Sequence, residues 1–192
     1  GSRLSANIAD RGAGIFAINS ILTLDTSTFS GNTVTRDGAA IYNIFYIPYP
    51  ELNPSTITEC TFVENTAAGN GGGVYNSGGI INVSDSTFSE HQAVLGGGIY
   101  SKSNGHSGNI SIINSMFSDN TEVESGGGIY ADGIGLSVEG SHFTGNAAIG
   151  ESTTGRGGGI YSINGPLTIT ASEFTSNTAL IGGGVYSGTD SN

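Results

Sequence analysis

The sequence has 192 residues, among them 33 glycines and only 4 prolines, a composition that argues against collagen and proline-rich linkers and requires the glycines to be either periodic or disordered. Acidic residues outnumber basic ones by 16 to 5, for a formal net charge of -11, so neither nucleic acid nor an anionic membrane surface is an expected partner. No apolar run approaches the roughly 20 residues that span a bilayer, and the single cysteine, Cys60, excludes an intrachain disulfide.

Two short motifs alternate from one end of the chain to the other. Each copy of Phe-x-x-Asn is followed, after about a dozen residues, by a copy of Gly-Gly-x-Ile/Val-Tyr. The first motif occupies residues 29–32, 62–65, 88–91, 117–120, 143–146 and 174–177, with a degenerate copy at 4–7. The second occupies residues 12–16, 38–42, 71–75, 96–100, 126–130, 157–161 and 182–186. The motifs therefore mark an internal repeat with a basic turn of about 25 residues.

A run of alternating apolar and short polar residues separates each second motif from the next first motif. These runs lie at 21–25, 56–59, 80–84, 110–114, 136–140 and 167–171. Such alternation predicts a strand with one buried face, which makes three strands per turn together with the two motifs. We therefore predict an all-β fold, a right-handed parallel β-helix or solenoid of about seven coils of roughly 25 residues, about 34 Å long.

Three apolar ladders are expected to form the core. The Phe residues of the first motif make one, the Ile and Val residues of the second motif make another, and the alternating runs supply the third. The third ladder consists of Leu24, Ile57, Val83, Ile112, Val138 and Ile169. We treat residues 1–192 as a single domain, and because neither end carries a polar capping element we expect a fragment of a longer solenoid.

Three insertions interrupt the repeat, at 43–55, 101–109 and 148–156. The first carries Phe45, Tyr46 and Tyr49 together with three prolines, which stiffen the loop. It leaves the coil at the same corner as 101–109, so both loops should project from one side. We predict an exposed aromatic contact site here, the alternative being that the loop packs onto the flank of the solenoid.

A repeat in which Phe-x-x-Asn alternates with Gly-Gly-x-Ile resembles the passenger repeats of chlamydial polymorphic outer-membrane proteins and the adhesin-like β-helix proteins of methanogens. The resemblance covers nearly all of residues 4–186. It implies an exported, surface-displayed stalk or adhesin, in the first case an autotransporter passenger. The chain departs from the pattern in having Gly more often than Ala at the third motif position and His91 in place of one Asn.

Two polar columns are interpreted as parts of the scaffold. The Asn residues of the first motif should point inward at a bend and hydrogen-bond one another, forming a ladder of side-chain amides. A column of Ser two residues before each Phe should also be interior, and Cys60 shares its register. Cys60 is therefore expected to be a buried small residue and not a nucleophile.

An aromatic column follows the Ile and Val residues of the second motif. Strand alternation places it on the outer face, beside glycines that would form a flat trough without side chains. The column contains Phe16, Tyr42, Tyr75, Tyr100, Tyr130, Tyr161 and Tyr186. Such a stripe suits the apolar faces of sugar rings, so Tyr42, Tyr75, Tyr100, Tyr130 and Tyr161 are candidate binding residues. In the alternative, the tyrosines only stabilise the sheet and the glycines serve a tight bend.

Acidic residues repeat in two registers. Glu64, Glu90 and Asp119 occupy equivalent positions on successive coils, and a bound cation such as Ca²⁺ would relieve their repulsion, although side chains at a turn can also splay into water. Glu59 and Asp85 each lie three residues before a Phe and form a candidate catalytic carboxylate pair.

These features favour a non-catalytic, surface-displayed adhesin or stalk segment that contacts a cell-surface glycan or protein. We expect an extracellular or cell-surface location, no cofactor unless Ca²⁺ binds the acidic column of Glu64, Glu90 and Asp119, and no membrane insertion of this segment. One rival is a polysaccharide lyase or hydrolase of β-helix fold. A second is an ice-binding solenoid, suggested by the outward Thr and Ser residues that flank each Phe.

Overall fold

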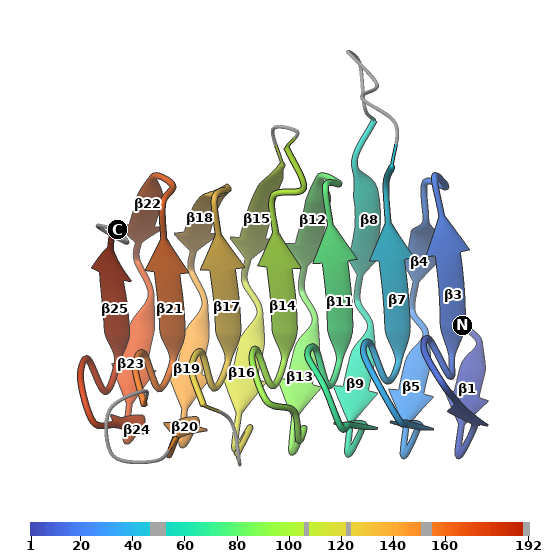
Figure 1. The fold of residues 1–192 in the computed structure, drawn as a ribbon, viewed down its shortest axis with the longest axis horizontal. Coiled ribbons are helices and arrows are strands. Elements are labelled where there is room, and N and C mark those ends of the chain that lie inside the picture. The colour runs from blue at the N-terminus through green and yellow to red at the C-terminus, as the bar shows by residue number, and fades with distance from the viewer. Residues whose placement is uncertain (47–52, 106–107, 122–123, 151–154, 190–192) are drawn as a thin grey trace.

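The computed structural model describes residues 1–46, 53–105, 108–121, 124–150 and 155–189, and the regular structure in these ranges consists of β-strands alone. Every strand pair in this part of the chain is parallel. The strands stack side by side into a rod whose coils follow one another in chain order (Figure 1). No helix in the described ranges is long and apolar enough to cross a membrane.

Three sheets run along the rod, and each coil contributes one strand to each of them, except that the last coil has no strand in the aliphatic sheet among the described residues. The Phe sheet contains β1 (Arg3–Ser5), β5 (Thr28–Ser30), β9 (Thr61–Val63), β13 (Thr87–Ser89), β16 (Met116–Ser118), β19 (His142–Thr144) and β23 (Glu173–Thr175). The Tyr sheet contains β3 (Ile15–Ile18), β7 (Ile41–Ile44), β11 (Val74–Ser77), β14 (Ile99–Lys102), β17 (Ile129–Asp132), β21 (Ile160–Ile163) and β25 (Val185–Gly188). The aliphatic sheet contains β4 (Thr23–Asp25), β8 (Ser55–Thr58), β12 (Ile81–Ser84), β15 (Asn109–Ile113), β18 (Gly135–Glu139) and β22 (Leu167–Thr170).

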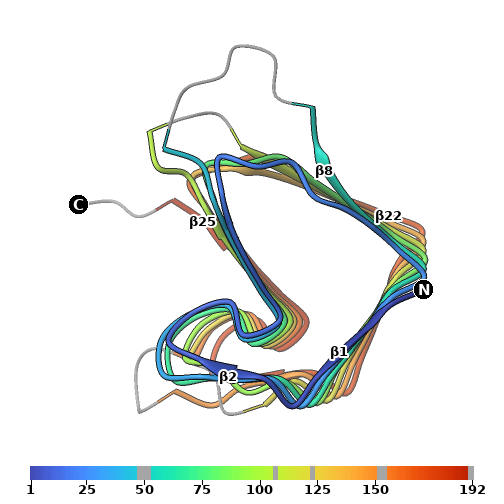
Figure 2. The ribbon, with the colours of Figure 1, turned by 90° about the vertical axis from the view of Figure 1, so that its right-hand side faces the viewer.

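Short strands form a side lobe between the Phe sheet and the Tyr sheet. They are β2 (Ile8–Ala9), β6 (Thr33–Val34) and β10 (Thr66–Ala67) in the first coils, and β20 (Ala147–Ala148) and β24 (Thr178–Ala179) in the last. Small residues such as Val34, Ala39 and Ala67 fill the lobe with an apolar cluster of its own. Figure 2 shows the lobe folding back toward the outer side of the Tyr sheet.

Figure 2, which looks along the rod from the N-terminal coil, also shows the handedness. The chain passes clockwise through the Phe sheet, the lobe, the Tyr sheet and the aliphatic sheet while it recedes from the viewer. A clockwise path that recedes is a right-handed helix. The predicted right-handed parallel β-helix is therefore confirmed, with seven strands in the Phe sheet and seven in the Tyr sheet.

The register gives the length of each coil. Arg3 pairs with Thr28, 25 residues further along, and Val74 pairs with Ile99 at the same interval. Ile41 pairs with Val74 at an interval of 33 because the insertion 43–55 lies between them. Insertions therefore lengthen individual coils without shifting the register of the strands that follow.

The core is made of the three predicted ladders. Phe29, Phe62, Phe88, Phe117 and Phe143 are fully buried, and the rings from Phe29 to Phe174 stack in one column with centroids 4.5–4.8 Å apart. The Ile and Val residues of the Tyr sheet and of the aliphatic sheet complete one continuous apolar cluster. In the end coils the ladder members are less covered, as Ile169 illustrates.

Glycine is required at the bend that leads into the Tyr sheet. The first glycine of each second motif has a positive φ, for example +63° at Gly96, which is strained for a residue with a side chain. A Cβ on Gly98 would lie 2.7 Å from the carbonyl oxygen of Gly128 in the next coil. Because Gly96 and Gly98 are buried in this bend, the alternative in which the glycines serve a tight bend is confirmed, and the flat, exposed glycine trough is wrong.

Candidate functional site

The Asn column points inward and forms a hydrogen-bonded ladder. The Nδ2 of Asn32 donates to the Oδ1 of Asn65 at 2.8 Å, and the Nδ2 of Asn120 donates to the Oδ1 of Asn146 at 2.7 Å. The Nδ2 of each of these four Asn residues also donates to a backbone carbonyl oxygen, as Asn120 Nδ2 does to that of Phe88. Asn32, Asn65, Asn120 and Asn146 are fully buried, which confirms the scaffold interpretation.

His91 interrupts this ladder. Its Nδ1 accepts the backbone N–H of Asn65 at 3.1 Å, so the neutral ring carries its proton on Nε2, and that nitrogen is buried without a partner. The side chain is fully buried, and desolvation lowers the pKa of His91 to about 3. His91 therefore stays neutral in the folded chain and has no role as a general acid or base near neutral pH.

The Ser column is interior too, and Cys60 shares it. Each hydroxyl donates to the carbonyl oxygen two residues earlier, as Ser86 does to Ser84 at 2.7 Å, and accepts the N–H of its counterpart in the preceding coil. The Sγ of Cys60 makes the same contact with the carbonyl oxygen of Thr58. Burial raises the pKa of the Cys60 thiol. The prediction of a buried cysteine is confirmed, and its lack of a nucleophilic role stays a prediction.

The aromatic column lies outside the core, on the face of the Tyr sheet that the side lobe approaches. Seven rings from Phe16 to Tyr186 form one stack, with centroids 4.8–5.1 Å apart. Arg11 lies over the ring of Tyr42 and Arg156 over the ring of Tyr186, at 5.6 and 5.2 Å from the centroids.

Little of this aromatic stack is open to solvent. Tyr42, Tyr75, Tyr100 and Tyr161 are each only 6–7% exposed, whereas Phe16 at the first coil is 53% exposed. Desolvation raises the pKa of Tyr75 to about 12 and raises that of Tyr42 and Tyr100 as well. The stack therefore offers ring edges more than ring faces, and its role in binding stays a prediction.

The first insertion is anchored at its stem. Phe45, predicted to be exposed, is only 2% exposed, and this prediction is wrong because its ring packs over Gly79, whose missing side chain leaves room for it. Tyr46 is 61% exposed, as predicted. Tyr49 lies outside the described residues.

The stems of the first two insertions meet on one side of the rod. The Nδ2 of Asn104, in 101–109, donates to the carbonyl oxygen of Phe45, so the two stems touch across the intervening coil. That coil turns at Gly78 and Gly79. Asn104 lies over Gly78, and Phe45 lies over Gly79. The expectation that both loops leave at one corner is confirmed, and Figure 1 shows both stems at the same edge.

The acidic residues lie at two corners of the coil. Glu64, Glu90 and Asp119 all have positive φ at the same corner and line a shallow groove with Thr66, Gln92 and Thr121. Among the described residues, no three His, Cys, Asp or Glu side chains are grouped closely enough to hold a metal ion. Glu59 and Asp85 are exposed at another corner, and both have positive φ. The calcium site stays a prediction.

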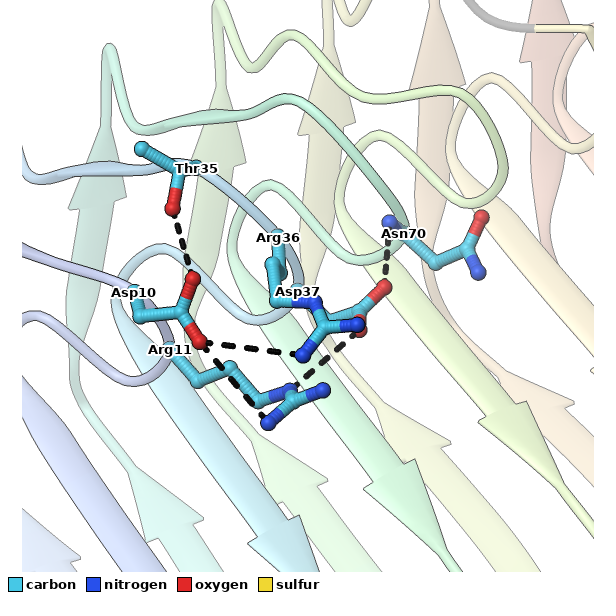
Figure 3. A network of polar contacts seen from close by, with 6 residues as sticks. All are labelled: Asp10, Arg11, Thr35, Arg36, Asp37 and Asn70. Carbon is cyan, nitrogen blue, oxygen red and sulfur yellow. Dashed lines mark hydrogen bonds and ion pairs between the residues drawn. The ribbon is translucent and has the colours of Figure 1, made fainter.

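A charged network joins the lobe to the bend in the first coils (Figure 3). Asp10 receives a hydrogen bond of 2.7 Å from the hydroxyl of Thr35 and lies 3.8 Å and 3.9 Å from Arg11 and Arg36. Arg11 also lies 3.7 Å from Asp37, whose other oxygen accepts the backbone N–H of Asn70. Two of the five cations are thus engaged with acids of the same lobe.

Sequence reasoning missed a groove on the outer face of the aliphatic sheet. It has a volume of about 410 Å³ and is lined by polar residues of four successive coils, namely Asn82, Asn109, Ser111, Ser137 and Thr168. Apart from Asn109, which lies just before a run, these residues are outward positions of the alternating runs. The signal was therefore present in the sequence, but alternation alone does not distinguish a solvated strand face from a groove.

Two segments of the chain match the repeat of the Chlamydia polymorphic membrane proteins (PMPs), at residues 26–44 and 59–77. Each match runs from the corner before the Phe sheet, through the Asn ladder and the lobe, into the Tyr sheet. No curated protein and no solved structure gives a match.

Proposed function

We propose that this PMP-like β-helix repeat protein is a non-catalytic adhesin or stalk segment that contacts a cell-surface glycan or protein. Its repeat family implies association with the outer membrane or cell surface, in the manner of an autotransporter passenger. A rod with continuous hydrogen-bonded ladders from end to end is suited to holding contact sites away from a surface.

The observation that carries the proposal is the anchored insertion 43–55. The ring of Phe45 is buried over Gly79 and its carbonyl oxygen is held by Asn104, while the next residue, Tyr46, is exposed. The backbone N–H of Tyr46 also donates to the Oδ1 of Asn19 at 2.7 Å. An exposed aromatic ring on a fixed stem loses little conformational entropy when a partner binds, which is a property of effective contact residues.

The test compares two exposed aromatic residues on neighbouring coils. Beads coated with the wild-type chain should adhere to host cells or retain ligands on a glycan array, and Tyr46→Ala should reduce this binding at least tenfold. Phe16→Ala removes an exposed ring of similar size from the first coil and should leave binding unchanged. Wild-type beads that bind no cell and no glycan, or equal binding by the wild type and Tyr46→Ala, would contradict the proposal.

A further inference from the structure

The groove on the aliphatic sheet has a definite construction. Strand pairing places Asn82, Ser111, Ser137 and Thr168 side by side on β12, β15, β18 and β22, so their side chains form a row parallel to the rod axis. Their neighbours along each strand, such as Val83 and Val138, face the core, which fixes the row on the outer side. In Figure 2 this sheet is the side that carries the labels β8 and β22.

At one edge of the groove, a neighbouring coil covers Gly135. Gly135 has no side chain, and a Cβ there would lie 2.5 Å from the Oδ1 of Asn109 and 3.6 Å from the Cγ of Pro166. The side chain of Asn109 therefore covers Gly135, and together with Pro166 it bounds one edge of the groove. The volume of about 410 Å³ lies within the range of small-ligand sites, roughly 300–1,000 Å³.

The chemistry of the groove is uncharged. None of the described residues that line it is acidic, basic or histidine, although the whole chain carries a net charge of -11. Its polar groups are hydroxyls and amides, which donate and accept hydrogen bonds without favouring an ion of either sign. Ile80 and Pro166 add apolar contacts at the same edge. This combination complements a neutral ligand rich in hydroxyl groups and carrying apolar C–H faces.

The position of the groove distinguishes between polymers. A peptide that adds to a sheet needs unpaired backbone N–H and C=O groups at a sheet edge. Here the strands β12, β15, β18 and β22 are hydrogen-bonded to one another, and the groove lies on the face of the sheet. Side chains are therefore the groups it presents, and they repeat once per coil along the axis, about 4.8 Å apart.

We propose that the outer face of the aliphatic sheet, from β12 to β22, binds a neutral polysaccharide that lies along the rod axis. Ser111 and Ser137 form the floor contacts, and Asn82 and Asn109 hydrogen-bond the sugar hydroxyls. This proposal rests on the proposed function and assigns part of its surface contact to a site that is separate from Tyr46.

The experiment uses native affinity electrophoresis of the whole chain in gels that contain one polymer each. Dextran, a β-glucan and a galactomannan are the neutral probes, and polygalacturonate is the anionic one. At least one neutral polymer should retard the wild type, and Ser137→Glu should weaken that retardation at least tenfold. The matched control is Thr144→Glu, which adds the same charge to an exposed position on the next strand along the chain, in the Phe sheet.

A second variant removes polar groups without adding charge. Asn82→Ala combined with Asn109→Ala should weaken retardation, and a circular dichroism spectrum like that of the wild type would show that the fold is kept. Retardation of Ser137→Glu equal to the wild type, or retardation by polygalacturonate alone, overturns the groove proposal. If Tyr46→Ala loses cell adhesion while no neutral polymer retards the wild type, the groove proposal fails and the proposed function stands. If no surface or polymer binds at all, both fail.

Discussion

At the scale of single residues, His91 is the exception in the amide ladder, because it occupies a position that is Asn in the other coils. In the other coils an Asn side chain supplies both a donor and an acceptor at the bend after the Phe sheet. His91 supplies the acceptor through Nδ1, while its Nε2–H is buried without a partner. A buried polar group that lacks a hydrogen bond costs on the order of 1–3 kcal/mol, so one coil is locally weaker than its neighbours.

His91 makes the stability of the chain sensitive to acid. Its pKa is about 3 in the folded chain and near the ordinary value of 6.5 when unfolded, so protons favour the unfolded chain. The stability that depends on neutral His91 is complete above pH 6.5 and is lost as the pH falls from 6.5 toward 3, by up to about tenfold in the folding equilibrium per pH unit. Urea midpoints at pH 7 and pH 5 should fall more for the wild type than for His91→Asn. Parallel falls would contradict this.

A regular member of the ladder should be costly to remove. Asn120→Ala deletes the donor to Asn146 and to the carbonyl oxygen of Phe88, and leaves the N–H of His91 without its acceptor. We expect a loss of roughly 3 kcal/mol in the free energy of unfolding, measured by urea denaturation. Asn82→Ala, at an exposed strand position, is the control and should change stability by less than about 0.5 kcal/mol. Similar losses in both variants would show that the ladder contributes nothing specific.

At the scale of elements, columns of similar residues either stabilise or destabilise the fold. Stacked Phe and Tyr rings attract one another, whereas three carboxylates in one column repel. Glu64, Glu90 and Asp119 are held at a corner by positive φ and have solvent on one side. The repulsion is therefore screened by water and salt and amounts to tenths of a kcal/mol.

Glu90→Gln tests this column because Glu90 is its middle member. The variant should be more stable than the wild type by about 0.2–0.5 kcal/mol at low ionic strength, and the difference should vanish at 1 M salt. Thermal unfolding at both salt concentrations measures it, and Glu139→Gln on the aliphatic sheet is the control. The calcium prediction requires Ca²⁺ to raise the midpoint of the wild type more than that of Glu90→Gln. Equal shifts in the two proteins would remove it.

At the scale of the whole molecule, the coils are interchangeable units whose strands pair only with those of the neighbouring coils. The interval between Val74 and Ile99 is a whole coil of 25 residues, and it returns every side chain to its own ladder. An insertion that is not a whole coil would break this match between coils. A shift of one residue turns every side chain of a strand to the opposite face, which would place apolar residues on the outer face.

A duplicated coil should therefore fold. Inserting a second copy of residues 74–98 after Gly98 extends each ladder by one member, and we expect a cooperative unfolding transition with a larger β signal in the far-ultraviolet circular dichroism spectrum. Inserting residues 74–86 alone breaks the order of strands and should leave the chain unfolded or aggregated. Equal folding of the two insertions would contradict the model of interchangeable coils.

How much could be predicted from the sequence differs between ladders and loops. The ladders repeat, so one pattern of motif and spacing places Phe88, Ile99 and Asn120 correctly. Phe45 lies in an insertion that does not repeat. Nothing in that segment indicates that Gly79, on the next coil, leaves room for the ring of Phe45. The burial of the Tyr stack was missed for the same reason, since it depends on how the side lobe folds toward the Tyr sheet.

The sequence by itself determined the fold class, the number of coils, the three apolar ladders and the inward Asn and Ser columns. It could do so because a stacked repeat converts sequence spacing directly into spatial neighbourhood. Only the tertiary structure decided which surface features are buried and which are exposed. These features are the glycines buried at a bend, the anchored stem of the insertion 43–55, and the groove beside Gly135. Burial at these places depends on contacts between coils and on the size of residues from different coils, and no single segment of the sequence encodes these.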